Sequence, residues 1–143
     1  MTQWKATCLV SGSGSGLALI LDEPLSLWGG LNPETGEITD RRHPQSGGIV
    51  SGQVLILPTG RGSSSASSIL LEAIKAETAP TAIITAEVDG ILTLGAVVAQ
   101  EIYGQAPPVV VLSAADYTAV CAHLRANPNS IVTVQNETVN VVT

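Results

Sequence analysis

The chain has 143 residues, the size of one domain, and a chain of this length can bury a sizeable core without disulfides or metal. Its formal net charge is −6, and its six Lys and Arg residues form no run, which argues against a nucleic-acid partner and against anionic membranes. Phe is absent although 45% of the residues are apolar, so we expect a core of Val, Ile, Leu and Ala. Charged residues make up only 13%, which fits a chain that buries part of its surface against a partner, or one with a Ser/Thr-rich surface.

The two cysteines, Cys8 and Cys121, lie far apart in the chain, and each sits in an apolar context. They form no CxxC pair, so we expect buried free thiols and no metal site. The N-terminus has no basic segment followed by a long apolar one, and no apolar run approaches the ~20 residues that span a bilayer. We therefore expect a cytoplasmic protein without a membrane partner.

The first third of the chain is expected to be rich in β-structure. Residues 4–10 and 17–21 have strand-like patterns, and SGSGSG between them (residues 11–16) predicts a flexible hairpin turn rather than a phosphate-binding loop. Residues 23–48 are rich in Gly, Pro, Asn and Asp, which mark turns. A loop this long in a small domain is usually functional or disordered. Because it contains Trp28, we favour an ordered binding loop.

The rest of the chain alternates apolar strands with helices. We predict strands over residues 52–58, 81–86 and 108–112, helices over residues 64–77, 89–104 and 113–127, and a C-terminal hairpin around Gln135 and Asn136. The second helix is expected to end at Gly104, and Ser113 with Asp116 three residues on predicts an N-cap for the third. The strands are continuously apolar, which is typical of a sheet covered on both faces. The pattern predicts one layered α/β domain, residues 1–143, with one or two sheets.

One predicted strand ends in an unusual sequence, TGRGSSSASS, residues 59–68. Gly60 and Gly62 permit backbone dihedrals that other residues avoid, so the chain can turn sharply into the helix with free N–H groups. Those groups, the helix dipole and Arg61 favour an anion, such as a substrate carboxylate or a negatively charged serine oxygen. A plain Ser N-cap with solvated neighbours accounts for the same residues.

The chain has two histidines, and they differ in context. His123 lies within a predicted helix and is expected to be structural. His43 lies in the long loop and is the better functional candidate. A serine hydrolase that uses Ser63 and His43 is a possible third function, but the chain has no G-x-S-x-G motif to support it.

Three stretches together resemble the aconitase X family. PLSLWGGLNPETGEITDRRHP (residues 24–44) and GQVLILPTGRGSSSASSILLEAI (residues 52–74) resemble its swivel domain or small subunit, and APTAIITAEVDGILTLGAVVAQEIYG (residues 79–104) resembles a further motif. The resemblance covers roughly residues 4–112. It implies the swivelling β/β/α domain of the aconitase superfamily.

The resemblance also implies a partner and a cofactor. In this family the small unit works with a large catalytic unit, fused or separate, that carries an iron–sulfur cluster. Such a cluster needs several cysteine ligands close together, which two distant cysteines do not supply. We therefore expect a hetero-oligomer in which the large subunit holds the cluster and this chain binds none.

The family chemistry is the dehydration of a small hydroxy acid. The serine that matches the family's proton-abstracting base is Ser63. The residues expected to bind substrate beside it are Arg61, Gly62, Ser64 and Ser65. The motif residues expected near the cleft or the subunit interface are Trp28, Gly29, Gly30, Asp40, Arg41 and His43.

Two branches of the family compete for this chain. LWGGLNPETG, DRRHP and GRGSSS look closer to the bacterial enzymes that dehydrate cis-3-hydroxy-L-proline. The archaeal phosphomevalonate dehydratases, in the mevalonate pathway, more often have FLGG and GKGS. A binding module that keeps the swivel fold without chemistry is the alternative from another class.

Overall fold

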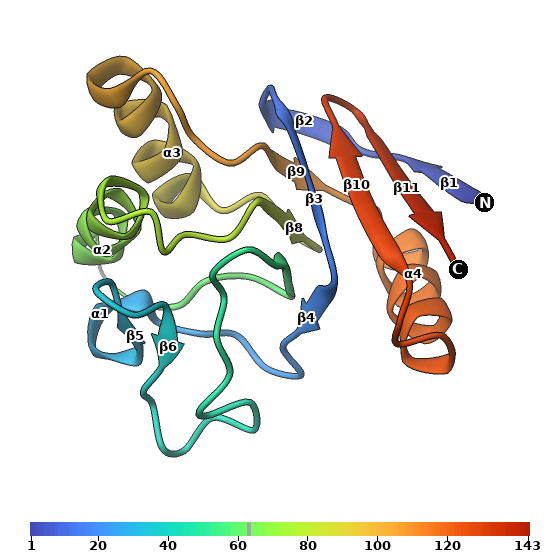
Figure 1. Cartoon of the computed structure of the whole chain (residues 1–143), viewed down its shortest axis with the longest axis horizontal. Coiled ribbons are helices and arrows are strands. Elements are labelled where there is room, and N and C mark those ends of the chain that lie inside the picture. The colour runs from blue at the N-terminus through green and yellow to red at the C-terminus, as the bar shows by residue number, and fades with distance from the viewer. Residues whose placement is uncertain (63) are drawn as a thin grey trace.

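The computed structural model describes residues 1–62 and 64–143 of the chain. Figure 1 shows three layers: a four-stranded sheet at one side, a five-stranded sheet in the middle and a pair of helices at the other side. The predicted layered α/β architecture with two sheets is therefore confirmed.

The five-stranded sheet forms the middle of the molecule. Across the sheet its strands are β2 (Thr7–Val10), β9 (Val109–Val111), β8 (Ala82–Thr85), β7 (Val54–Leu57) and β4 (Ala18–Ile20). The strands β4, β7, β8 and β9 are parallel, and β2 pairs antiparallel with β9. Every residue of β7 and β8 is buried, as the continuous apolar runs predicted.

The four-stranded sheet is antiparallel. Its strands, in order, are β1 (Thr2–Lys5), β11 (Thr138–Val142), β10 (Ile131–Gln135) and β3 (Ser13–Gly16). The hairpin of β10 and β11 confirms the predicted C-terminal hairpin, and its turn includes Asn136 in the left-handed region at φ 51°. Only Ala6 separates β1 from β2, so the predicted strand over residues 4–10 is split between the two sheets.

The prediction of a flexible turn over residues 11–16 is wrong, because Ser13–Gly16 is the strand β3 and pairs with β10. Glycine is usually unfavourable within a strand. At Gly14, however, an added Cβ would overlap the carbonyl oxygen of Thr81 in the neighbouring layer. Glycine is therefore present here because the two backbones pass too close for a side chain.

Three helices flank the sheets: α2 (Ser65–Lys75), α3 (Gly90–Tyr103) and α4 (Ala114–Ala126). The helix α3 is capped by Asp89. It ends at Gly104, which has φ 71°, as the sequence predicted. At the start of α4 the Ser113 hydroxyl accepts a hydrogen bond from the Asp116 N–H at 3.2 Å, which confirms the predicted cap. All three predicted helices therefore form.

Two hydrophobic clusters lie on opposite faces of the five-stranded sheet. On one face, residues of the sheet pack under α2, α3 and the long N-terminal loop. On the other face, alternate residues of the same strands pack under α4 and the inner face of the four-stranded sheet. The long loop is ordered and contains the turn α1 (Leu27–Gly30) and a small ladder of β5 (Leu31–Asn32) with β6 (Glu37–Ile38).

The two cysteines are free thiols, as expected, but only Cys121 is buried. Cys8 is half-exposed, because it lies on β2 at the edge of its sheet. Burial raises the pKa of the Cys8 thiol, and the negative charge of Glu137 raises it further. No helix in the described part of the chain is long and apolar enough to cross a bilayer.

Candidate functional site

The candidate site lies at the carboxyl edge of the five-stranded sheet. Three neighbouring parallel strands, β4, β7 and β8, end at this edge, and their following loops meet there. Leu25 and Gly60 form an isolated parallel bridge, and the Arg61 N–H donates to the Leu25 carbonyl at 3.0 Å. In open parallel sheets this edge is where ligands bind.

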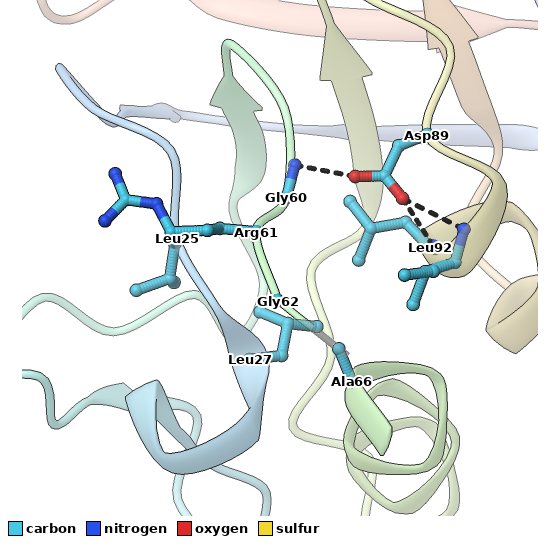
Figure 2. Close-up of a pocket in the computed structure, with 9 residues that line it drawn as sticks. Leu25, Leu27, Gly60, Arg61, Gly62, Ala66, Asp89 and Leu92 are labelled. Carbon is cyan, nitrogen blue, oxygen red and sulfur yellow. Dashed lines mark hydrogen bonds between the residues drawn. The ribbon is translucent and has the colours of Figure 1, made fainter. Parts of the chain in front are cut away.

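Asp89 joins two of these loops and was not predicted as a site residue. Its Oδ2 accepts hydrogen bonds from the Gly60 N–H at 2.6 Å and from the Thr59 hydroxyl at 3.2 Å. Its Oδ1 accepts from the N–H groups of Ile91 at 3.0 Å and Leu92 at 2.9 Å (Figure 2). Asp89 is 8% exposed. Its hydrogen bonds fix the loop of Gly60, Arg61 and Gly62, which we call the GRG loop, to the start of α3.

Only part of the role of Asp89 could have been predicted from the sequence. An acidic residue at the start of a predicted helix is a typical N-cap, so its bonds to Ile91 and Leu92 could have been predicted. The bonds to the Gly60 loop, about thirty positions earlier in the chain, depend on the tertiary fold.

The loop turns into α2 as the glycines predicted. Gly62 has φ 97°, a conformation that side chains rarely adopt, and Gly62 and Arg61 are exposed. Ser63, the predicted base, lies outside the described residues. Ser64 follows as the N-cap residue of α2, with helical dihedrals, and its side chain makes no capping hydrogen bond in the described structure. The Ser64 side chain therefore does not cap α2 in the described part of the structure.

A small cavity of about 60 Å³ lies behind this loop. Figure 2 shows Gly60, Gly62 and Ala66 along one side of it and Asp89 and Leu92 on the other. Most of its remaining lining is apolar, from the loop after β4 and the start of α3. The cavity therefore lies between the GRG loop and the start of α3.

A second, larger pocket of about 310 Å³ lies on the other side of Arg61. Figure 2 shows the Arg61 guanidinium pointing away from Asp89, beyond the segment that contains Leu25. We call this second pocket the charged pocket; it is lined by Glu23, Pro24, Asp40, Arg42, His43 and Arg61. The structure thus brings together Asp40, His43 and Arg61 from the predicted set.

His43 lines the charged pocket with a ring that is held by the backbone. It is 6% exposed, its Nδ1 accepts a hydrogen bond from the Gln45 N–H at 3.0 Å, and its Nε2 lies 3.0 Å from the Glu23 carbonyl. Since Nδ1 accepts, the proton is on Nε2, which donates to that carbonyl. Both nitrogens are engaged, so His43 orders the loop and is not poised as a catalytic base.

The other predicted cleft residues occupy different positions. Gly30 is buried against Leu25, and Gly29, with φ 79°, is exposed. Trp28 is 60% exposed, and Arg41 is exposed too. Trp28 and Arg41 line neither of the two pockets described here, whereas Arg42, which was not selected from the sequence, lines the charged pocket.

The chain's own ligand set can be tested against the iron–sulfur cluster that the resemblance implies. In the described residues no three His, Cys, Asp or Glu side chains gather as a metal site, and the cysteines lie on β2 and α4. These residues do not fit such a cluster, so no step of a reaction is derived through one in this chain.

Comparison with known proteins gives consistent matches. The family described as Aconitase X swivel domain matches residues 3–141. The cis-3-hydroxy-L-proline dehydratase of Hypocrea jecorina is 40% identical over 136 residues, which are 94% of this chain and 23% of that protein. The phosphomevalonate dehydratase small subunit of Methanothermobacter thermautotrophicus is 42% identical over 88 residues, which are 62% of this chain and 67% of that protein.

A solved structure matches the whole chain. The crystal structure of Thermococcus kodakaraensis aconitase X (holo-form) has a TM-score of 0.83 at 26% identity, covering 100% of both chains. The predicted three-layer fold is therefore confirmed. The chain spans less than a quarter of the length of the Hypocrea protein that it matches.

Proposed function

The chain belongs to the aconitase X swivel-domain family, and on this premise we propose that it is the swivel part of a hydro-lyase that dehydrates a hydroxy acid. The observation that carries the proposal is its similarity, over nearly its whole length, to a relative named as a dehydratase. We propose that residues 1–143 act as one domain in this reaction.

In the proposed reaction Ser63 is the base. Its side-chain oxygen, in the alkoxide form, takes the proton from the carbon α to the substrate carboxylate and becomes a hydroxyl group. The C–H electron pair forms the second bond to the β carbon. The C–O bond at the β carbon breaks, so that the hydroxyl group and one proton leave as water. The substrate contacts that we propose are Arg61, Gly62, Ser64 and Ser65, at the loop that Asp89 fixes.

The reaction also needs a large catalytic part, either in the same polypeptide or as a separate subunit. The length of the Hypocrea relative and the words "small subunit" in the Methanothermobacter name support this. We propose that this part holds the iron–sulfur cluster, which supplies a Lewis acid for the leaving hydroxyl. We place the exposed residues Trp28, Gly29 and Arg41 toward this large part, with the buried Gly30 behind them in the same loop. A cytoplasmic location stays a prediction.

The substrate that we propose is cis-3-hydroxy-L-proline. The match to the Hypocrea relative extends over more of this chain than the match to the Methanothermobacter relative, and the LWGG, DRRHP and GRGSSS motifs agree with that branch. Phosphomevalonate is the alternative, since the Methanothermobacter small subunit is similar in identity and nearer in length.

The test is an assay of this chain purified anaerobically with its cluster-bearing large part. We expect turnover of cis-3-hydroxy-L-proline and none of phosphomevalonate. Turnover of phosphomevalonate alone would move the chain to the alternative branch. Turnover of neither substrate by a complex with an intact cluster would contradict both substrates and favour a binding module without chemistry.

A further inference from the structure

The charged pocket has an unusual balance of charge for a site beside a carboxylate-binding loop. The residues that line it include two arginines, Arg42 and Arg61, and two acidic residues, Glu23 and Asp40. The pocket therefore carries two positive and two negative formal charges. The fifth polar side chain, His43, is neutral in the tautomer that its two backbone partners impose.

These opposite charges share a pocket without neutralising one another. Among residues 1–62 and 64–143 the one ion pair within 4.0 Å joins Arg125 to Asp22, at the surface. Asp40 uses one carboxylate oxygen to accept the Arg42 backbone N–H at 3.0 Å. Within the same described residues the guanidinium groups of Arg42 and Arg61 and the Glu23 carboxylate have no hydrogen-bond partner. Because these four side chains do not pair with one another within 4.0 Å, each can bind an oppositely charged group of a ligand.

We propose that the charged pocket is a subsite for a zwitterion, whose carboxylate binds the arginines and whose ammonium binds the carboxylates. This rests on the proposed function and deepens it, because it assigns to residues of this chain the recognition of both charged groups of an imino-acid substrate. A guanidinium binds a carboxylate through two parallel hydrogen bonds, and a carboxylate accepts from a secondary ammonium.

The same pocket selects against the alternative substrate. A phosphorylated hydroxy acid carries several negative charges and no positive one. Two of the four charged side chains would repel it, and like charges placed face to face are a common device for rejecting a wrong ligand. Arg61 lies two positions before Ser63, so the subsite borders the loop where the α carbon of the substrate would sit.

The experiment compares R42Q and E23Q in the complex with the large part, assayed with cis-3-hydroxy-L-proline. We expect each substitution to raise KM about 10- to 100-fold, since each removes one charged hydrogen-bond partner. The kcat should change much less, because neither side chain acts on the proton. The matched control is E34Q, because Glu34 is exposed and does not line the pocket. R42K keeps the positive charge but loses the two parallel hydrogen bonds of a guanidinium, so its KM should lie between those of the wild type and R42Q. It replaces R42Q in the test if R42Q does not fold.

Three probes separate the two halves of the subsite. L-proline carries both charges, tetrahydrofuran-2-carboxylate lacks the ammonium, and pyrrolidine lacks the carboxylate. As inhibitors or calorimetric ligands of the wild-type complex, L-proline should bind best. E23Q should reduce the advantage of L-proline over tetrahydrofuran-2-carboxylate. R42Q should reduce its advantage over pyrrolidine.

The outcomes separate this proposal from the proposed function. Turnover of hydroxyproline with KM unchanged in R42Q and E23Q would overturn the subsite and leave the function standing. L-proline binding that R42Q and E23Q abolish, in a complex without hydroxyproline turnover, would support the subsite and overturn the function. A wild-type complex that neither turns over hydroxyproline nor binds L-proline overturns both.

Discussion

The two faces of the five-stranded sheet are formed by the same strands but differ in their roles. Toward the four-stranded sheet and α4, residues such as Ile84 and Val110 pack in an aliphatic cluster. Toward α2 and α3, their neighbours such as Ile83 and Val109 pack in a second one. The interiors are alike, but the second face ends in the GRG loop, Asp89 and the charged pocket. The two faces therefore differ in function because of the loops at the strand ends, whereas the strands themselves stabilise both faces in the same way.

The largest effect that sharpens this contrast is expected at Ser63. Ser63→Ala should lower kcat of the complex by about 100- to 10,000-fold, which is the usual loss when a general base is removed. The measurement is steady-state turnover beside a thermal melt, and the melting temperature should not change. Ser68→Ala, an exposed serine of α2, is the control. Wild-type turnover by Ser63→Ala would remove Ser63 from the mechanism.

The next effect compares the two faces directly. Ile83 and Ile84 are adjacent on β8, both 0% exposed, and point to opposite clusters. Either residue replaced by Ala should lower the free energy of unfolding by about 2–5 kcal/mol, measured by urea denaturation. In the folded complex only Ile83→Ala, on the face of the site, should also lower kcat. Equal losses of kcat would show that the two faces are not functionally distinct.

A substitution at the contact between the two sheets should lower the free energy of unfolding less than the substitutions on β8 do. Gly14→Ala places a methyl group against the Thr81 carbonyl, so we expect a loss of about 1–3 kcal/mol in the free energy of unfolding. Gly90→Ala is the matched control, because a Cβ there meets nothing within 4 Å and its φ is not positive. If the two variants were equally stable, the close approach of the layers would be wrong.

Substitutions of Asp89 test whether its hydrogen bonds position the GRG loop. In Asp89→Asn the amide oxygen can still cap α3, but the amide nitrogen cannot accept the Gly60 N–H. We expect a loss of about 1–3 kcal/mol in unfolding free energy and a lower kcat with little change in KM. Asp89→Ala should lose the cap as well and be less stable still. An unchanged kcat in Asp89→Asn would show that the bond to Gly60 does not position the loop.

The smallest effect is expected away from the site, at Cys8. Its thiol pKa is raised by burial and by Glu137, so at pH 8 less reactive thiolate is present than in a free thiol. Glu137→Gln removes the second cause and lowers the pKa, so alkylation by iodoacetamide should become about twofold faster, a modest gain because a surface charge is screened by solvent. Glu34→Gln is the control, and a slower reaction in Glu137→Gln would contradict the sign.

The sequence predicted the elements whose cause is local. The aliphatic runs of β7 and β8, the Ser113 cap and the Gly104 end of α3 all follow from residue type and spacing. The strand β3 was missed because its Gly14 is explained by a close contact with Thr81, which lies far along the chain. Local propensity does not report such contacts.

The site was predictable only where it coincides with a motif. The GRG loop was predicted from its glycines. The hydrogen bonds of Asp89 to Thr59 and Gly60 were not, because they form only in the tertiary fold. In an irregular loop no periodicity tells which of two adjacent arginines faces inward, so Arg41 was selected and Arg42, which lines the charged pocket, was not. The role of His43 was likewise set by partners that only the folded loop provides.

The way in which the N-terminal strands cross between the sheets has a mechanical consequence. One residue, Ala6, separates β1 from β2, and one residue, Leu17, separates β3 from β4, and in each pair the two strands belong to different sheets. A torque applied to one sheet is thus transmitted to the other through two stretches of covalent backbone as well as through side-chain contacts. The two sheets should turn together as one rigid unit.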